Sequence, residues 1–125
     1  GMGNAFGLVA SEAAYTHGNQ WLGQLLTYIR KNIDFVENYL KEHIPQITMI
    51  RPEGTYLIWL DCRKLNLQGD KLSQFFITKA KVGFNDGRWF GTGGEGFMRM
   101  NVACPLSTVQ KALENIKNAV TNENL

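Results

Sequence analysis

An arginine in a strand-like alternation is the residue of this sequence best placed to do chemistry. Apolar and polar side chains alternate here, with Met98, Met100 and Val102 on one face and Phe97, Arg99 and Asn101 on the other. A strand would hold Arg99 rigidly, and its planar guanidinium can bind a carboxylate through two parallel hydrogen bonds. Most arginines on such strands are only solvated, so the pattern alone leaves both interpretations open.

A glycine-rich stretch, Gly91–Gly96 (GTGGEG), directly precedes this strand. Such turns cradle a phosphate where a strand, the turn and a helix follow one another. Here the turn leads into a strand, and no Gly-Lys-Ser/Thr follows it. The stretch is therefore predicted to be a mobile surface loop or a loop that lines a site next to Arg99.

The histidines and cysteines do not indicate a metal site or a nucleophile. His17 and His43 stand at opposite ends of a helical region, and no third ligand follows at a useful spacing. Cys62 and Cys104 each end an apolar segment and fit no CxxC spacing. Buried, inert thiols and no bound metal are therefore expected.

Three aromatic side chains could stack on a ligand. Trp59 is expected in the core of a central strand, whereas Trp89 and Phe90 either line a cleft or cover the edge of the sheet. Basic and aromatic residues do not interleave as they do in RNA-binding sheets. The 13 Lys and Arg against 11 Asp and Glu give a net charge of only +2, so nucleic-acid binding is disfavoured.

The chain has 125 residues, 44% of them hydrophobic, which is enough for one domain with a core. No apolar run approaches the roughly 18 residues of a membrane span. The start, Gly1–Asn4, lacks the basic and apolar regions of a signal peptide. Gly1 before Met2 is interpreted as the remnant of a removed tag, and a cytoplasmic protein that binds no membrane is expected.

Helical periodicity dominates the first third of the sequence and its end. Residues 4–15 predict a short, weak helix. Steps of three and four predict a long amphipathic helix that Asn19 caps and Pro45 ends. Its apolar stripe consists of Leu22, Leu25, Leu26, Ile29, Ile33, Val36 and Leu40. A last helix is predicted after Pro105, with a capping box at Ser107–Gln110.

Strand patterns follow the long helix. Ile47–Ile50 and Thr55–Leu60 predict two strands joined by a turn. The second is apolar at every position from Tyr56 to Leu60, which predicts that both of its faces are covered.

The central part of the sequence adds one helix and one more strand before the glycine-rich stretch. Asp70 is predicted to cap the helix, Val82–Phe84 is predicted to be a strand, and Asn85–Gly87 is predicted to be a turn. The order α-α-β-β-α-β-β-α predicts an α+β fold, with a small, mostly antiparallel sheet packed by helices.

Several segments together match a known family. They are Arg51–Arg63, Ala80–Phe84 and Trp89–Pro105, with further matches in Asn4–Tyr15 and Trp21–Leu22. This set resembles the C-terminal part of the class I/II aminotransferase-like enzymes, which depend on pyridoxal phosphate and have fold type I. More narrowly, it is similar to their cystathionine β-lyase branch, the MalY/PatB type.

The resemblance implies a role for Arg99. In that family a large domain holds pyridoxal phosphate through a Schiff-base lysine and phosphate contacts. An arginine on a strand of the small C-terminal domain binds the α-carboxylate of the amino-acid substrate, and Arg99 is the matching residue. The resemblance also implies that residues 1–16 pack on the large domain and that residues 17–125 form the C-terminal domain.

The lysine that holds the cofactor is not expected in this chain. A Schiff-base lysine is partly desolvated. All eight lysines lie on polar helix faces or in polar connections: Lys31, Lys41, Lys64, Lys71, Lys79, Lys81, Lys111 and Lys117. The resemblance therefore implies a fragment without its large domain, with no catalytic, cofactor-binding or metal-binding residue, that is inactive alone. Its exposed apolar N-terminal segment predicts a homodimer.

A second hypothesis is a free-standing, non-catalytic module that binds an amino acid, another carboxylate or a protein partner. Arg99 would then bind the ligand without any chemistry following. The sequence leaves open whether the parent enzyme is a lyase or an aminotransferase, because both use the same small-domain arginine. It also leaves open which amino acid is the substrate.

Overall fold

The computed structural model describes residues 3–125, so the interpretation of Gly1–Met2 as a tag remnant lies outside the described residues. The chain divides into two compact units, Gly1–Lys31 and Asn32–Leu125. The predicted boundary after residue 16 is a different division, and it stays a prediction. None of the described helices is both long and apolar enough to cross a membrane.

The first unit consists of helix α1 (Ala5–His17) and the beginning of helix α2 (Asn19–His43). Asn4 caps α1, because its Oδ1 accepts a hydrogen bond of 2.7 Å from the Gly7 amide. Asn19 is already the first helical residue of α2, so its predicted role as a cap is wrong, and the Gly18 carbonyl accepts from the Leu22 amide instead. None of the side chains of α1 is buried.

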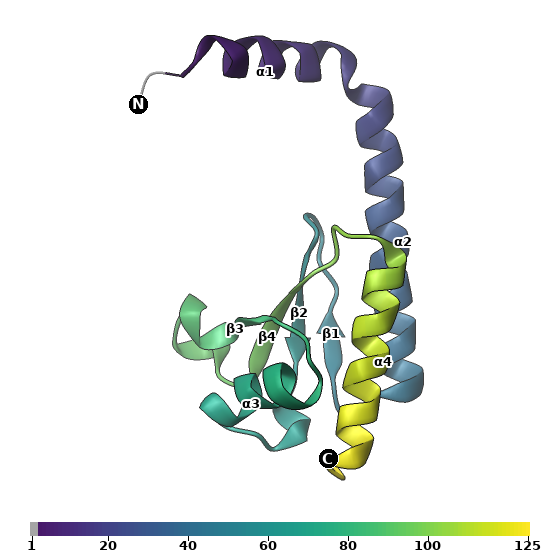
Figure 1. The fold of residues 1–125 in the computed structure, drawn as a ribbon, viewed down its shortest axis with the longest axis vertical. Helices are drawn as coiled ribbons and strands as arrows, with labels where there is room; N and C mark the ends of the chain where they lie inside the picture. Colours follow the sequence, from purple (N-terminus) through teal and green to yellow (C-terminus); the bar gives the residue numbers. More distant parts are fainter. Residues whose placement is uncertain (1–2) are drawn as a thin grey trace. The chain divides into compact units, whose positions relative to one another are not determined.

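The second unit contains an antiparallel sheet of four short strands (Figure 1). The strands are β1 (Thr48–Ile50), β2 (Leu57–Asp61), β3 (Asn85–Asp86) and β4 (Phe97–Asn101). They lie in the order β1-β2-β4-β3, so β4, which carries Arg99, is a central strand. The α+β class and the antiparallel sheet are as predicted.

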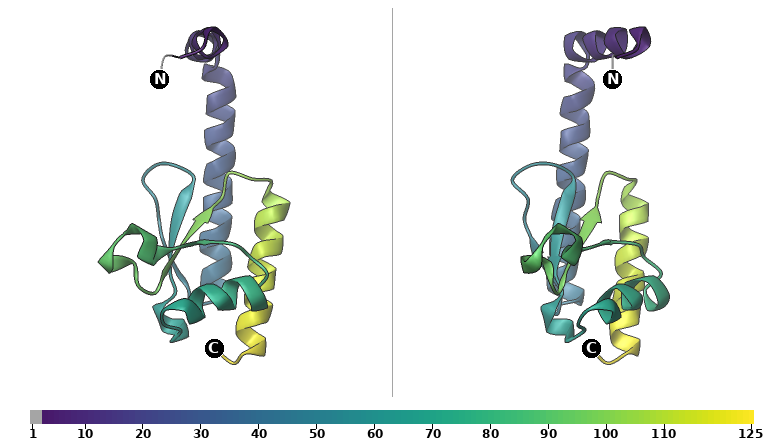
Figure 2. Two further views of the ribbon diagram at one scale, coloured as in Figure 1. Left: turned by 60° about the vertical axis from the view of Figure 1, so that its left-hand side comes forward. Right: turned by 90° about the vertical axis from the view of Figure 1, so that its left-hand side faces the viewer.

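One face of this sheet forms the core of the second unit. Ile58 and Leu60 of β2 and Met98 and Met100 of β4 are buried on it. Residues 32–43 of α2 and all of α4 (Leu106–Asn122) lie on the same side of the sheet (Figure 2). These helices contribute the buried residues Ile33, Val36, Leu40, Val109, Leu113, Ile116 and Val120. The predicted alternation of β4 is therefore confirmed, with the helices covering its methionine face.

Strand β2 is covered on one face only, which contradicts the predicted burial of both faces. Its residues alternate between half-buried and buried, and Tyr56 before it is 43% exposed. The apolar run is longer than the core requires because its second face lines an aromatic hollow, described below.

The segment between β2 and β4 differs most from the prediction. Helix α3 (Asp70–Gln74) continues as a π-helical turn, Phe75–Lys79, and Asp70 is its first residue rather than its cap. The predicted strand Val82–Phe84 is absent, because the Val82 amide bonds back to the Phe76 carbonyl and closes the turn. The predicted turn at residue 85 instead begins strand β3.

The predicted capping box of the last helix is also wrong. Helix α4 begins at Leu106, directly after Pro105, and no side chain caps it. The Pro105 carbonyl accepts from the Thr108 and Val109 amides. Proline therefore sets the start of the helix, and Ser107 falls inside its first turn.

Candidate functional site

The helix-free face of the sheet carries Arg99 in a row of four side chains. The strand register pairs Ile50 with Trp59, Trp59 with Arg99, and Arg99 with Asn85. Residues opposite one another in neighbouring strands point to the same face, so this row crosses the whole sheet. Trp59 is half-buried on this face rather than in the core, which corrects the prediction.

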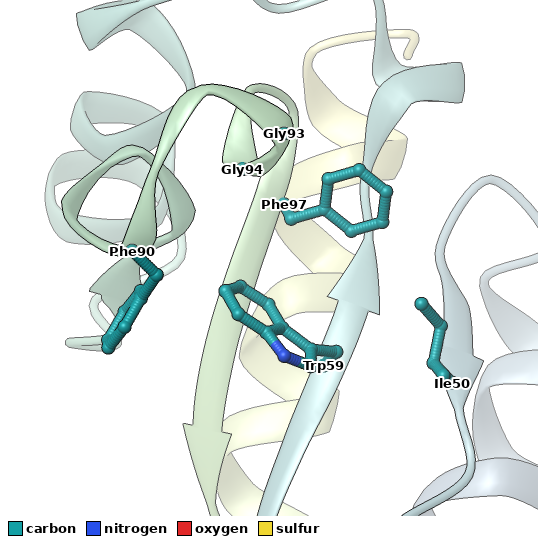
Figure 3. A pocket seen from close by; sticks show the side chains of 6 residues that line it. All are labelled: Ile50, Trp59, Phe90, Gly93, Gly94 and Phe97. Carbon is teal, nitrogen blue, oxygen red and sulfur yellow. The ribbon is translucent and has the colours of Figure 1, made fainter.

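An open hollow of about 320 Å³ lies beside this row. It is lined by Ile50, Trp59, Phe90, Gly93, Gly94 and Phe97. Figure 3 shows the Trp59 ring between Phe90 and Ile50. The Trp59 ring meets Phe90 and Phe97 edge to face, at centroid distances of 5.4 and 6.1 Å. Phe90 lines this hollow, which confirms the prediction that it lines a cleft. Trp89 is 71% exposed and does not line the hollow.

Arg99 is held by neutral groups. Its Nη2 donates a hydrogen bond of 3.0 Å to Asn85 Oδ1, and its guanidinium carbon lies 4.4 Å from the centre of the Phe90 ring. Its Nε is buried and has no hydrogen-bond partner among residues 3–125. No carboxylate in this described part of the chain forms an ion pair with it, although Arg51, Arg63 and Arg88 all have one.

The unpaired state of Arg99 has a physical consequence. Leaving a buried donor of a charged group unsatisfied costs free energy that a hydrogen-bonding anion recovers. A carboxylate is the anion whose two oxygens match a guanidinium best. The guanidinium of Arg99 is therefore chemically able to bind a carboxylate.

The glycines of the predicted loop allow two short helical turns to touch. These are the 3-10 turns η3 (Gly87–Phe90) and η4 (Thr92–Gly94). A Cβ on Gly94 would lie only 1.9 Å from the Gly87 carbonyl oxygen, and Gly91 has a φ of +124° that other residues rarely adopt. The glycines are thus explained by packing and by lining the hollow, with no phosphate required.

An ion pair between the buried Asp86 carboxylate and the exposed Arg88 fixes the segment before this loop. Asp86 is 6% exposed and accepts from the Arg88 amide, from Arg88 Nε and Nη2, and from the Ser73 hydroxyl. Arg88 also pairs with Asp70 at 2.7 Å, which ties the loop to α3. The Arg88 guanidinium holds the pKa of the Asp86 carboxyl far below its usual value, with Ser73 adding to the effect and burial opposing it. The sequence does not reveal this pair, because Asn85–Gly87 has the composition of a turn.

The remaining candidates do not add catalytic groups. Burial raises the pKa of the Cys62 thiol far above its usual value, and burial also raises that of Cys104, so neither thiol ionises readily at neutral pH. No group of three metal-ligating side chains occurs in residues 3–125. His17 ends α1, and His43 ends α2 with its ring against Tyr39.

The lysines of the chain do not fit a Schiff-base site. Seven of them are exposed, and the eighth, Lys117, is half-buried on α4. None lies on a strand of the sheet. The described residues therefore offer no desolvated amine next to Arg99, and pyridoxal phosphate would need a lysine from outside this chain.

Comparisons with known proteins agree with this fold. The chain is 44% identical over 118 residues to cystathionine β-lyase PatB of Bacillus subtilis (strain 168), a match that covers 94% of this chain and 30% of that protein. It superimposes with a TM-score of 0.90 on a pyridoxal-phosphate-bound putative aminotransferase of Clostridium difficile 630, at 45% identity, covering 94% and 30% of the two chains. No family model matches the chain.

A second solved structure extends the same relationship. Cystalysin from Treponema denticola, which contains pyridoxal 5'-phosphate, gives a TM-score of 0.94 at 35% identity, covering 98% of this chain and 32% of that one. The chain thus has the fold of the C-terminal domain of fold-type I, pyridoxal-phosphate-dependent enzymes. Among them, its sequence relatives are cystathionine β-lyases, and the chain spans about 30% of the length of these relatives.

The Asp86–Arg88 pair predicts a pH-dependent stability. Asp86→Asn should lower the free energy of unfolding by about 1.5–3 kcal/mol at pH 7, because it weakens hydrogen bonds to a charged partner. The folded chain keeps Asp86 ionised at a lower pH than the unfolded chain, whose Asp pKa is about 3.9. The stabilisation is therefore complete above about pH 5 and is lost as the pH falls below about 4.

Urea unfolding followed by circular dichroism at pH 7 and pH 3 measures this effect. Asp70→Asn is the matched control, because Asp70 pairs with the same Arg88 Nη2 but its side chain is 90% exposed. That control should change stability by no more than about 0.5 kcal/mol. Equal losses in the two variants, or a gap between wild type and Asp86→Asn that does not shrink at pH 3, would contradict the prediction.

Proposed function

We propose that this chain acts as the C-terminal domain of a pyridoxal-phosphate-dependent C–S lyase or aminotransferase, and that Arg99 binds the α-carboxylate of its amino-acid substrate. The observation that carries the proposal is that the Arg99 guanidinium contacts only neutral groups and forms no ion pair with a carboxylate of the described residues. The names of the relatives support the class of enzyme.

The residues around Arg99 suit this task. A strand backbone fixes the position of Arg99, and two parallel hydrogen bonds fix the orientation of a bound carboxylate. The apolar hollow beside it lowers the local dielectric constant, which strengthens the attraction between the two charges. This chain thus contributes binding and orientation of the substrate.

Pyridoxal phosphate supplies an electron sink for the carbanion formed at the substrate Cα when it is bound. Because the lysines of this chain do not fit its site, we propose that the part of the enzyme outside this chain holds it. Residues 1–16 would pack on that part, and residues 17–125 would form the substrate-binding domain. The exposure of Phe6 and Tyr15, each 89%, supports this packing role.

Substitution of Arg99 tests the proposal. In a chimera where this chain replaces the matching segment of the Bacillus subtilis cystathionine β-lyase, Arg99→Ala should lower kcat/KM for L-cystathionine on the order of a hundredfold. The loss corresponds to about 3 kcal/mol for two charge-assisted hydrogen bonds. Arg51→Ala is the control, since Arg51 is already paired with Asp34 and Glu37, and it should leave kcat/KM unchanged.

The 125-residue chain itself provides a second measurement. Titration with L-alanine should shift the side-chain Nε–H resonance of Arg99 in NMR spectra, and L-alaninamide, which has no carboxylate, should not. An Arg99→Ala chimera as active as the unsubstituted one would overturn the carboxylate role. Tight binding of L-alanine by the isolated chain would favour the free-standing module.

The exposed lysines predict no stable cofactor adduct on the isolated chain. Incubation with pyridoxal phosphate and reduction with borohydride should leave only scattered, substoichiometric labelling, because no described lysine is desolvated next to Arg99. Intact-mass spectrometry and peptide mapping measure the labelling. A stoichiometric adduct at one lysine would show that the chain holds the cofactor itself.

The apolar side chains of the first unit predict self-association of the isolated chain. Phe6, Leu8, Val9, Tyr15 and Trp21 are all at least 66% exposed, and exposed apolar patches tend to associate. Light scattering should show a homodimer that Phe6→Glu weakens. Ile77→Glu, at a 54% exposed position of the second unit, is the control. A monomer at high protein concentration would contradict the prediction.

A further inference from the structure

We propose that Asn85 and Phe90 are positioning residues for Arg99, and that the neutral charge of Asn85 is what keeps the guanidinium available for a substrate carboxylate. The inference rests on the proposed function, because it concerns the same carboxylate site. It adds two residues that touch the guanidinium rather than the ligand.

The two residues constrain the guanidinium in different directions. Asn85 is the cross-strand partner of Arg99, and its Oδ1 accepts from one terminal nitrogen. The Phe90 ring lies under the guanidinium at 4.4 Å, in the geometry of a cation–π contact. A free arginine side chain loses rotamer entropy when it binds a ligand. Because Asn85 and Phe90 already hold the guanidinium in place, less of this entropy is lost when the ligand binds.

The other arginines of the second unit show why the amide of Asn85 matters. Arg63 and Arg88 also have a short polar partner, but in each case it is a carboxylate, from Asp61 and Asp86. Those guanidinium groups are neutralised within the chain. Asn85 has the same length and accepts the same kind of hydrogen bond, yet it leaves the charge of Arg99 uncompensated.

The segment Asn85–Phe90, which carries both positioning residues, is anchored independently of them. In the sequence, Asn85 and Phe90 stand on either side of the Asp86–Arg88 pair, which reaches Ser73 and Asp70 on α3. Gly87 packs against Gly94 so closely that neither could carry a Cβ. The two residues therefore approach Arg99 from a fixed backbone.

Two substitutions of Asn85 separate charge from shape. Asn85→Asp keeps the size and the hydrogen bond but adds a carboxylate next to Arg99, so it should weaken L-alanine binding by tenfold or more. Asn85→Ala removes only the hydrogen bond and should weaken binding by about threefold. A purely structural role predicts the opposite order, because aspartate replaces asparagine with less disturbance than alanine does.

Substitution of Phe90 tests the stacking contact. Phe90→Leu keeps an apolar side chain but removes the ring, so it should weaken L-alanine binding by about three- to tenfold and shift the Arg99 Nε–H resonance through loss of the ring current. Phe90→Tyr should restore both. Trp89→Leu, next to it but exposed, is the control and should change neither.

The 125-residue chain is titrated with L-alanine by NMR, and the same variants are assayed in the chimera as kcat/KM for L-cystathionine. If Arg99→Ala weakens binding while the variants of Asn85 and Phe90 do not, or if Asn85→Ala is more damaging than Asn85→Asp, this inference is wrong and the proposed function stands. If the unsubstituted chain binds no L-alanine and Arg99→Ala leaves the chimera fully active, or the chimera has no activity at all, both are wrong.

Discussion

The pairing of β2 with β4 is the constraint on which the rest of the second unit depends. Its register sets Ile58 opposite Met100 and Leu60 opposite Met98, facing α2 and α4. The same register sets Trp59 opposite Arg99 on the other face. Because side chains alternate with a period of two, a slip by one residue would turn the guanidinium into the apolar core and the methionines into solvent. The hydrophobic core and the position of Arg99 are thus fixed by one set of backbone hydrogen bonds.

The helix-free face combines two kinds of support for that guanidinium. The sheet provides Asn85 and Trp59 as neighbours in the row, while the loop after β3 provides Phe90. A loop is ordinarily the less rigid support. Here the Asp86–Arg88 pair offsets this by burying a carboxylate that has hydrogen bonds from three donor groups of the loop and from Ser73. Removing Arg88 would leave the buried Asp86 carboxylate without its counter-ion.

Local patterns sufficed to predict the helices, the alternation of β4 and the fold class, because periodicity reports which face of an element is buried. The strand predicted at Val82–Phe84 failed because a hydrogen bond from Val82 to Phe76 competes with strand pairing. The prediction of a capping box was wrong because α4 begins directly after Pro105, so Ser107 lies inside the helix. The partners of Arg99 could not be predicted from the sequence, for another reason. Asn85 and Phe90 meet it only through the register of β3, a non-local pairing that no sequence spacing encodes.

The arginines of the second unit differ in the charge of their nearest partner. Arg51, Arg63 and Arg88 are compensated by aspartate or glutamate within the chain. Arg99 has an amide and a ring, which stabilise a cation without neutralising it. A half-buried cation with a buried, unsatisfied Nε is a cost to the folded chain. That cost is explained if the anion arrives from outside, as the carboxylate of an amino acid would.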